Sequence, residues 1–150
     1  AEGNAGDSPT LSFAITTSGA AAGDITVDVA VNDGTAIAGS DYVDADTINF
    51  TIPAANIPGT TSFNVTVTGD NAFEGNETVG VVLSDATNGI LTQATATGTI
   101  SNDDAAPPNL TVGDVSVAEG DSGTTLLTFT VALDAAAPAA SGFFSSIEAQ

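Results

Sequence analysis

The stretch ITVDVAV at Ile25–Val31 decides the fold class of this chain. Every second residue is a branched aliphatic residue, and Thr26, Asp28 and Ala30 lie between them. Successive side chains of an extended strand point to opposite faces. The alternation therefore predicts a β-strand that buries one face and exposes the other to water.

Similar short segments recur between clusters of Gly, Asn, Asp and Pro, and no stretch shows the apolar period of a helix. Strands are predicted at Thr10–Thr17, Ile25–Val31, Thr47–Ile52, Ser62–Thr68, Thr78–Ser84 and Ala94–Ile100. Strands at this close spacing, with one polar face, are typical of an antiparallel all-β sandwich.

The charge composition is one-sided, with 19 Asp and Glu and no Lys, Arg or His, for a net charge of −19. We expect no nucleic-acid partner, because no side chain can meet a phosphate. We expect no direct membrane insertion, because no apolar run is long enough to span a bilayer. We also expect no enzyme, because the residues that most often act as bases and nucleophiles, including His, Cys and Lys, are absent.

The chain contains one repeat and the opening of the next. AEGDSGTTLLTFTV from Ala118 matches AEGNAGDSPTLSFAI from Ala1, and Glu119 minus Glu2 gives a period of 117 residues. The Pro-rich segment 105–109 (AAPPN) is predicted to be a stiff linker. The predicted organisation is a first domain at 1–104, this linker, and at 110–150 the start of a second repeat or a donor-strand segment.

The two copies differ in what precedes the AEG motif. The second copy has a predicted strand there, Leu110–Val117, and the first copy begins at AEG. The first sandwich is therefore expected to lack its opening strand, and an unpaired sheet edge invites strand addition. Strand 110–117, with Thr124–Leu133 as a further candidate, could fill the edge of the next copy or act in cis in a tandem array.

Acidic residues gather in predicted loops, namely Asp70, Glu74 and Glu77 in one and Asp103 and Asp104 in another. Crowded carboxylates repel one another, and here only an external cation can neutralise them. Calcium suits such a cluster, because it takes roughly 6–8 oxygen ligands. The alternative is that these acids are solvated turn residues, a role that Asp fills well.

Three passages in order resemble the Calx-beta domain family: DGTAIAGSDY (Asp33–Tyr42), GDNAFEGNETVGVVLS (Gly69–Ser84) and GTISNDD (Gly98–Asp104). The opening AEG fits the family as well. The resemblance covers about residues 1–104 and restarts near 110. It implies an immunoglobulin-like antiparallel β-sandwich, with calcium ligands at one end.

Carried over by motif, the resemblance implies that the metal ligands are Glu2, Asp41, Asp70, the Ala72 carbonyl, Glu74, Glu77, Asp103 and Asp104, with Asn102 in the same acidic run. Gly69 and Asn102 stand where the fullest family sites have acids, so we expect fewer ions here. Asp33 is interpreted as a turn residue, Tyr42 as a buried corner residue, and Phe73 as a core residue that holds the ligand loop.

The resulting hypothesis is a calcium-stabilised structural protein outside the cell or at its surface, of the secreted bacterial repeat type. It would be a repeat unit of an adhesin or filament that self-associates head to tail or forms a tandem array. The alternatives are a regulatory calcium-sensing domain of a larger protein and a ligand-binding adhesin module. The tail SGFFSSIEAQ (Ser141–Gln150) departs from the family pattern and has no interpretation.

Overall fold

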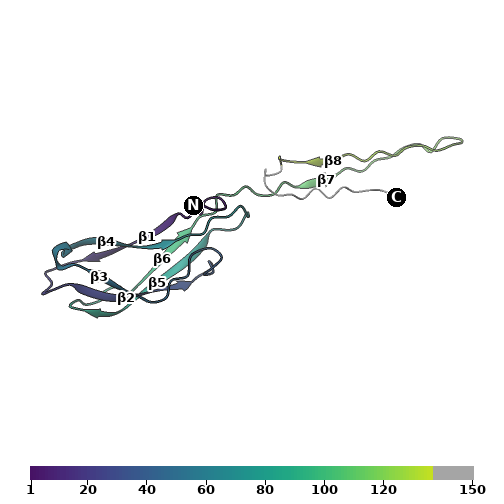
Figure 1. Cartoon of the computed structure of the whole chain (residues 1–150). Helices are drawn as coiled ribbons and strands as arrows, with labels where there is room; N and C mark the ends of the chain where they lie inside the picture. The colour runs from purple at the N-terminus through teal and green to yellow at the C-terminus, as the bar shows by residue number, and fades with distance from the viewer. Residues whose placement is uncertain (137–150) are drawn as a thin grey trace. The chain divides into compact units, whose positions relative to one another are not determined.

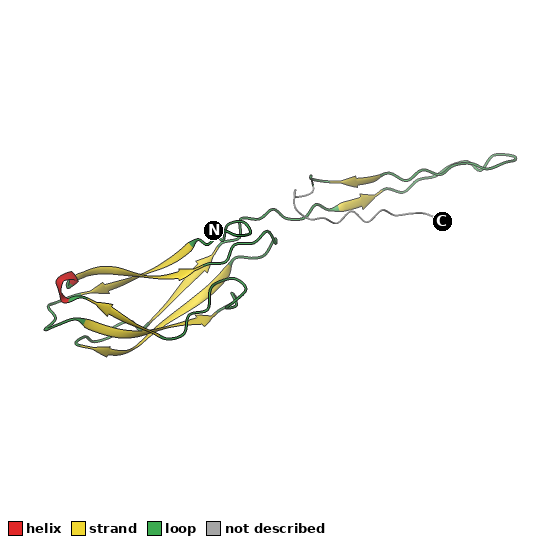
Figure 2. Ribbon diagram, viewed as in Figure 1, coloured by secondary structure: helices red, strands yellow, loops and turns green. Residues whose placement is uncertain are grey.

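The computed structural model describes residues 1–136 and divides into two units, Ala1–Asp104 and Ala105–Gln150. The tail at 141–150 lies outside the described residues. The strands are β1 (Thr10–Thr17), β2 (Ile25–Asp33), β3 (Ile48–Ile52), β4 (Gly59–Thr66), β5 (Glu77–Thr87), β6 (Thr95–Ile100), β7 (Leu110–Val112) and β8 (Val131–Leu133), with one 3-10 turn, η1 (Ala54–Asn56) (Figures 1 and 2). No helix among the described residues is long and apolar enough to cross a membrane.

The first unit is a sandwich of two antiparallel sheets, which confirms the predicted fold class. One sheet has the order β3-β2-β5-β6 and the other pairs β1 with β4. All six strands predicted for this unit are present. The polar ends of β2 and β5 extend further than the alternating pattern indicated, because β2 and β5 pair with each other out to Asp33 opposite Val79 and Thr26 opposite Thr87.

The core lies between the two sheets and is made by the alternating apolar residues of each strand. Val27, Val29 and Val79 are almost fully buried, as the pattern in Ile25–Val31 predicted. Phe63 of β4 meets Phe50 of β3 edge to face, with 6.0 Å between ring centroids. These contacts join the sheets and fix where the loops at each end emerge.

The described part of the second unit is an open hairpin. β7 and β8 pair antiparallel over three residues, from Leu110 opposite Leu133 to Val112 opposite Val131. The predicted strands Leu110–Val117 and Thr124–Leu133 were therefore too long. The apolar residues of this segment are exposed, because the described part of the unit supplies no second sheet to pack against.

Candidate metal centre

The loop between β2 and β3 carries Asp41 and is held by a buried tyrosine. Tyr42 is 1% exposed, and its hydroxyl donates a 2.6 Å hydrogen bond to Oδ1 of Asp33. The same oxygen accepts a 2.8 Å bond from the Ala38 amide. Tyr42 is thus the buried corner residue that the sequence predicted. Asp33, interpreted as a simple turn residue, instead anchors the whole loop.

Asp41 is positioned by the backbone of its own loop and by the segment that follows β4. Its Oδ2 accepts a 2.7 Å bond from the Ile37 amide, and its carbonyl accepts a 2.9 Å bond from the Thr68 amide. Thr68 leads directly into the loop that carries Asp70. One hydrogen bond therefore links the two loops that supply most of the acids.

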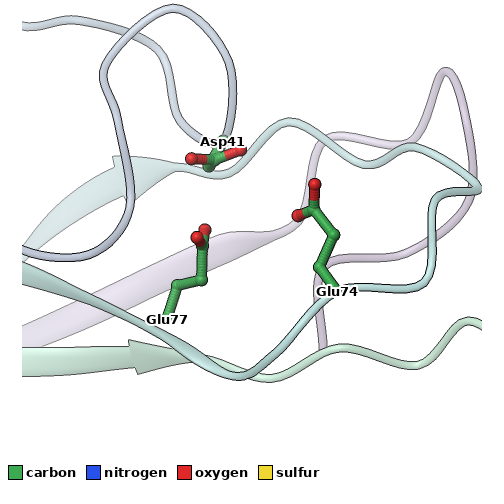
Figure 3. A group of neighbouring side chains, drawn as sticks. All are labelled: Asp41, Glu74 and Glu77. Atoms are coloured by element: carbon green, nitrogen blue, oxygen red, sulfur yellow. The ribbon is translucent and has the colours of Figure 1, made fainter.

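The loop from Gly69 to Asn76 places Glu74 and Glu77 beside Asp41. One carboxylate oxygen from each of these three acids lies within 4.8 Å of the others. Figure 3 shows that the three carboxylates point into a common space, although they come from two separate loops and the start of β5. Each residue can offer a ligand oxygen to one cation there.

The N-terminal segment closes the site from another side. Glu2 is only 5% exposed, and its amide donates a 3.0 Å bond to the Ser101 carbonyl. The Gly3 amide donates a 3.0 Å bond to Oδ1 of Asp103. The start of the first unit is therefore pinned to the segment that follows β6.

Gly69 is one of the two positions at which this chain lacks an expected acid, and its surroundings explain why. A Cβ atom at this position would lie 2.6 Å from the Asn4 carbonyl oxygen and 2.8 Å from those of Glu2 and Gly3. No side chain fits there without moving the backbone that carries Glu2. The glycine thus allows the N-terminal segment to approach the loop.

Asn102, the other departure, serves as a scaffold for the acids around it. Its Oδ1 accepts bonds from the amides of Glu74 at 3.4 Å and Asp104 at 3.3 Å. Its own amide donates to Oδ1 of Asn76 at 3.1 Å. Asn76 and Asn102 are positioning residues whose role the acid pattern alone did not reveal.

Three buried carboxylate oxygens in this region have no hydrogen-bond partner, namely Oε1 of Glu2, Oε2 of Glu77 and Oδ2 of Asp104. A buried polar atom without a partner is costly, and a buried charged one is more so. Because the chain has no Lys, Arg or His, no side chain can neutralise them. The unpartnered oxygens fit a cation bound among them.

The electrostatics of the cluster agree with this geometry. Burial, followed by the charge of Asp41 and a hydrogen bond to it, raises the pKa of Glu77 to about 7. Burial and the neighbouring acids raise the pKa of Glu2 and of Glu74 as well. Each of these carboxyl groups resists ionisation because it is partly buried and because its neighbours are also negative.

The acids predicted as ligands occupy one end of the first unit. Asp70 lies there with Oδ1 bonded to the Ala72 amide at 2.6 Å, and its charge acts on both Glu2 and Glu74. Ala72 is exposed, and the hydrogen bond to Asp70 is made by its backbone amide. Metal binding by the Ala72 carbonyl stays a prediction. We call the group of Glu2, Asp41, Asp70, Glu74, Glu77, Asp103 and Asp104 the acid cluster. Phe73 was predicted to be core and is 54% exposed, so that prediction was wrong.

Comparisons with known proteins agree with this fold. The sequence model of the Calx-beta domain matches residues 9–104. Similar solved structures are CBD12 from CALX1.2, with 23% identity and a TM-score of 0.52, and the calcium binding domain CBD12 of CALX1.1, with 24% identity and a TM-score of 0.51. Each match covers 63% of this chain and 38% of the other, so the chain spans less than half their length.

The apo form of the Calx CBD1 domain is also similar, with 25% identity, 63% of this chain and 83% of that chain covered, and a TM-score of 0.46. No curated protein matches the chain. The two CBD12 structures, with TM-scores above 0.5, are similar to this chain in fold. The family match extends from just before β1 through Asp104, over more than half of the sequence. The chain belongs to the Calx-beta domain family.

Proposed function

We propose that the acid cluster binds calcium and that the bound ion stabilises the sandwich. The observation that carries this proposal is the set of three buried, unpartnered carboxylate oxygens on Glu2, Glu77 and Asp104, in a chain that has no cationic side chain. A cation supplies the missing partner for each of them. Binding then adds its free energy to folding, because the unfolded chain holds no such site.

Calcium is the favoured ion because every donor here is a carboxylate, amide or backbone oxygen. Calcium accepts about 6–8 such ligands in irregular geometry, whereas magnesium demands a near-ideal octahedron. The cluster draws its oxygens from the N-terminus, two loops and the segment after β6, and this irregular donor set suits calcium. One similar structure is named a calcium binding domain, which supports the same choice.

The role that we infer for the ion is structural, in a repeat unit of an adhesin or filament outside the cell or at its surface. The internal repeat supports this role, because Glu119 and Asp121 restart the same motif after one linker. Copies would associate head to tail through the strand that precedes the second AEG motif.

The test is thermal unfolding of the full chain in calcium, in magnesium and in chelator at matched ionic strength. We expect calcium to raise the melting temperature by about 10 °C or more, since saturation at 100 times Kd adds about 2.7 kcal/mol. Magnesium should give a small shift. Equal melting temperatures in calcium and chelator would contradict the proposal.

Variants separate the acid cluster from general charge effects. Glu77→Gln should abolish most of the calcium shift, because it removes one member of the group Asp41, Glu74 and Glu77. The matched control is Asp85→Asn, which changes charge equally near the opposite end of β5. An equal loss of the calcium shift in both variants would mean that calcium acts through net charge alone.

The affinity distinguishes the structural role from regulatory sensing. Extracellular modules bind calcium with Kd near 10⁻⁴–10⁻³ M, whereas sensors respond at roughly 10⁻⁷–10⁻⁵ M. Calorimetric titration of the full chain with calcium measures this value directly. We expect the weaker range, and a Kd near 1 μM would favour the sensor.

A further inference from the structure

One long edge of β1 has no strand partner within residues 1–136. β1 pairs with β4 on its other edge in a two-stranded sheet, whereas the facing sheet has four strands. A cavity of about 650 Å³ lies beside the second half of β1. Its apolar lining includes Phe13 and Ile15 of β1 together with Val81 and Leu83 of β5. We call the free edge of β1 from Phe13 to Thr17, with this cavity, the edge slot.

The edge slot is open only at the end away from the acid cluster. Nearer the cluster, β6 lies tight against β1, because a Cβ atom on Gly98 would be 2.6 Å from Leu11 Cδ2 and 2.8 Å from Phe13 Cζ. Beyond Phe13 the two sheets leave the cavity between them. Ile90, which also lines the cavity, is 92% exposed.

The second repeat contains a strand pairing that residues 1–136 do not supply to the first repeat. The first copy, AEGNAGDSPTLSFAI, is one residue longer than AEGDSGTTLLTFTV, so the alignment takes a one-residue gap after AEG. With this gap TFTV matches SFAI, and Phe129, Val131 and Leu133 correspond to Phe13, Ile15 and Thr17. In the second repeat the strand before AEG pairs with this segment, with Leu110 opposite Leu133 and Val112 opposite Val131. Transferred to the first repeat, this register places a strand like β7 along β1, opposite Ile15–Thr17, which is the rim of the edge slot.

We propose that the edge slot accepts the segment Leu110–Val112 from a second copy of this chain, with Thr111 opposite Thr16. Cross-strand partners share a face of the sheet. Leu110 and Val112 would therefore point with Ile15 into the cavity, while Thr111 would point out with Thr16. Both apolar side chains are more than 60% exposed in the hairpin, so insertion gives them the burial that they lack. The proposal specifies the acceptor for the head-to-tail association proposed above, and rests on it.

The linker length favours a second copy over the chain's own segment 110–112 as the donor. Leu110 would pair at Thr17, the end of β1 away from the acid cluster, about 24 Å from Thr10. Asp104 lies past the end of β6, and six Cα steps from it to Leu110 reach only about 21 Å. A chain cannot easily fill its own slot in this register, and a neighbour can. Three residue pairs hold β7 to β8, together with hydrogen bonds between Asn109 and Asp134, so only a short ladder is lost when the segment exchanges partners.

The test is a disulfide cross-link between two variants of the full chain, which has no native cysteine. Thr16→Cys chains, uniformly labelled with ¹⁵N, are mixed with unlabelled Thr111→Cys chains under mild oxidation in calcium. Directly opposed residues lie about 4.5–5.5 Å apart, close enough for a disulfide. We expect a mixed disulfide that joins a labelled peptide from the first variant to an unlabelled peptide from the second, identified by mass.

The matched control replaces Thr16→Cys with Ser12→Cys, which points to the same outer face but lies four residues out of register. We expect at least tenfold less mixed disulfide with this partner. Equal yields from the two pairs, or a full chain that stays monomeric at about 100 μM in sedimentation velocity, would overturn the proposal. The second result would mean that no second copy occupies the slot.

A non-covalent test uses Leu110→Asp, which puts a charge where an apolar side chain enters the cavity, against Thr111→Asp, which puts the same charge on the outer face. Association should fall at least tenfold in the first variant and much less in the second. Calcium titration of both variants reports the acid cluster separately. Loss of association with an unchanged calcium shift is the expected result, whereas association without any calcium shift would refute the calcium site and leave the slot intact.

Discussion

The amide of Glu2 donates a 3.0 Å hydrogen bond to the carbonyl oxygen of Ser101, which fixes a buried glutamate beside the segment that carries Asp103 and Asp104. Glu2→Gln removes one charge there and keeps the side-chain shape. In chelator we expect a melting temperature a few degrees above wild type, the shift that about 1 kcal/mol of relieved repulsion produces in a domain of this size.

In saturating calcium we expect Glu2→Gln to melt at a lower temperature than wild type, because Gln offers the ion a neutral ligand in place of a carboxylate. Differential scanning calorimetry in both conditions checks the reversal. A variant that is less stable than wild type in both would show that Glu2 acts through packing and not through charge.

The pH dependence of the metal-free protein follows from Glu77, whose pKa is raised from 4.5 to about 7. Between these values the folded protein binds a proton that the unfolded chain has released, so the free energy of unfolding falls as pH rises. This contribution is complete below pH 4.5 and is lost above pH 7. The raised pKa values of Glu2 and Glu74 act in the same direction.

We therefore expect the melting temperature in chelator to decrease from about pH 5 to about pH 7.5 and the decrease to flatten in Glu77→Gln. Calcium should remove the decrease, since it favours the ionised carboxylates. A melting temperature that rises over this range in chelator would contradict the arrangement of the acid cluster.

The hydrogen bond from Tyr42 to Asp33 predicts a coupled pair. Tyr42→Phe should cost about 1.5–3 kcal/mol of stability, the usual net value of a hydrogen bond to a charged group, and should weaken calcium binding because the loop that carries Asp41 loses its anchor. Urea unfolding and calcium titration measure the two effects. The matched test is the double variant with Asp33→Asn, in which the tyrosine substitution should add little. Additive losses would show that the two residues act independently.

Two glycines of the same loop should respond differently to alanine. Gly69→Ala puts a Cβ within 3 Å of three carbonyl oxygens of the N-terminal segment, whereas at Gly75 no atom lies within 4 Å of the added Cβ. We expect Gly69→Ala to destabilise the fold by about 1–3 kcal/mol and to lower calcium affinity by displacing Glu2. Gly75→Ala should leave both nearly unchanged. Similar behaviour of the two variants in urea unfolding would rule out the close approach at Gly69.

The sequence predicted the sandwich well because strand burial leaves a period of two that local pattern reveals, as in Ile25–Val31. The errors lie where a residue's environment depends on distant partners. Phe73 is apolar but lies in the loop before β5, and only the fold determines that its side chain stays 54% exposed. Leu110–Val117 has the alternating pattern of a full strand, yet only Leu110–Val112 pairs, with Val131–Leu133. Pattern alone does not show how many residues a distant partner strand will pair.

The sequence predicted which acids belong to the acid cluster, but it did not predict the residues that hold them in place. Motif position alone named Glu2, Asp41 and the loop acids, and the structure gathers them at one end. The anchoring role of Asp33 depends on a tyrosine nine residues away, and that of Asn102 on amides from two segments. Such contacts leave no periodic signal in the sequence.

The bonds from Glu2 to Ser101 and from Gly3 to Asp103 also have a mechanical consequence. They join the first residues of the sandwich to the last ones before the linker. When the polypeptide is pulled, tension that arrives through the linker reaches Asp104 and Asp103 before it reaches any strand. An ion bound by Glu2 and Asp104 would then cross-link the two ends of the unit. The force needed to unfold the unit would depend on the calcium concentration around it.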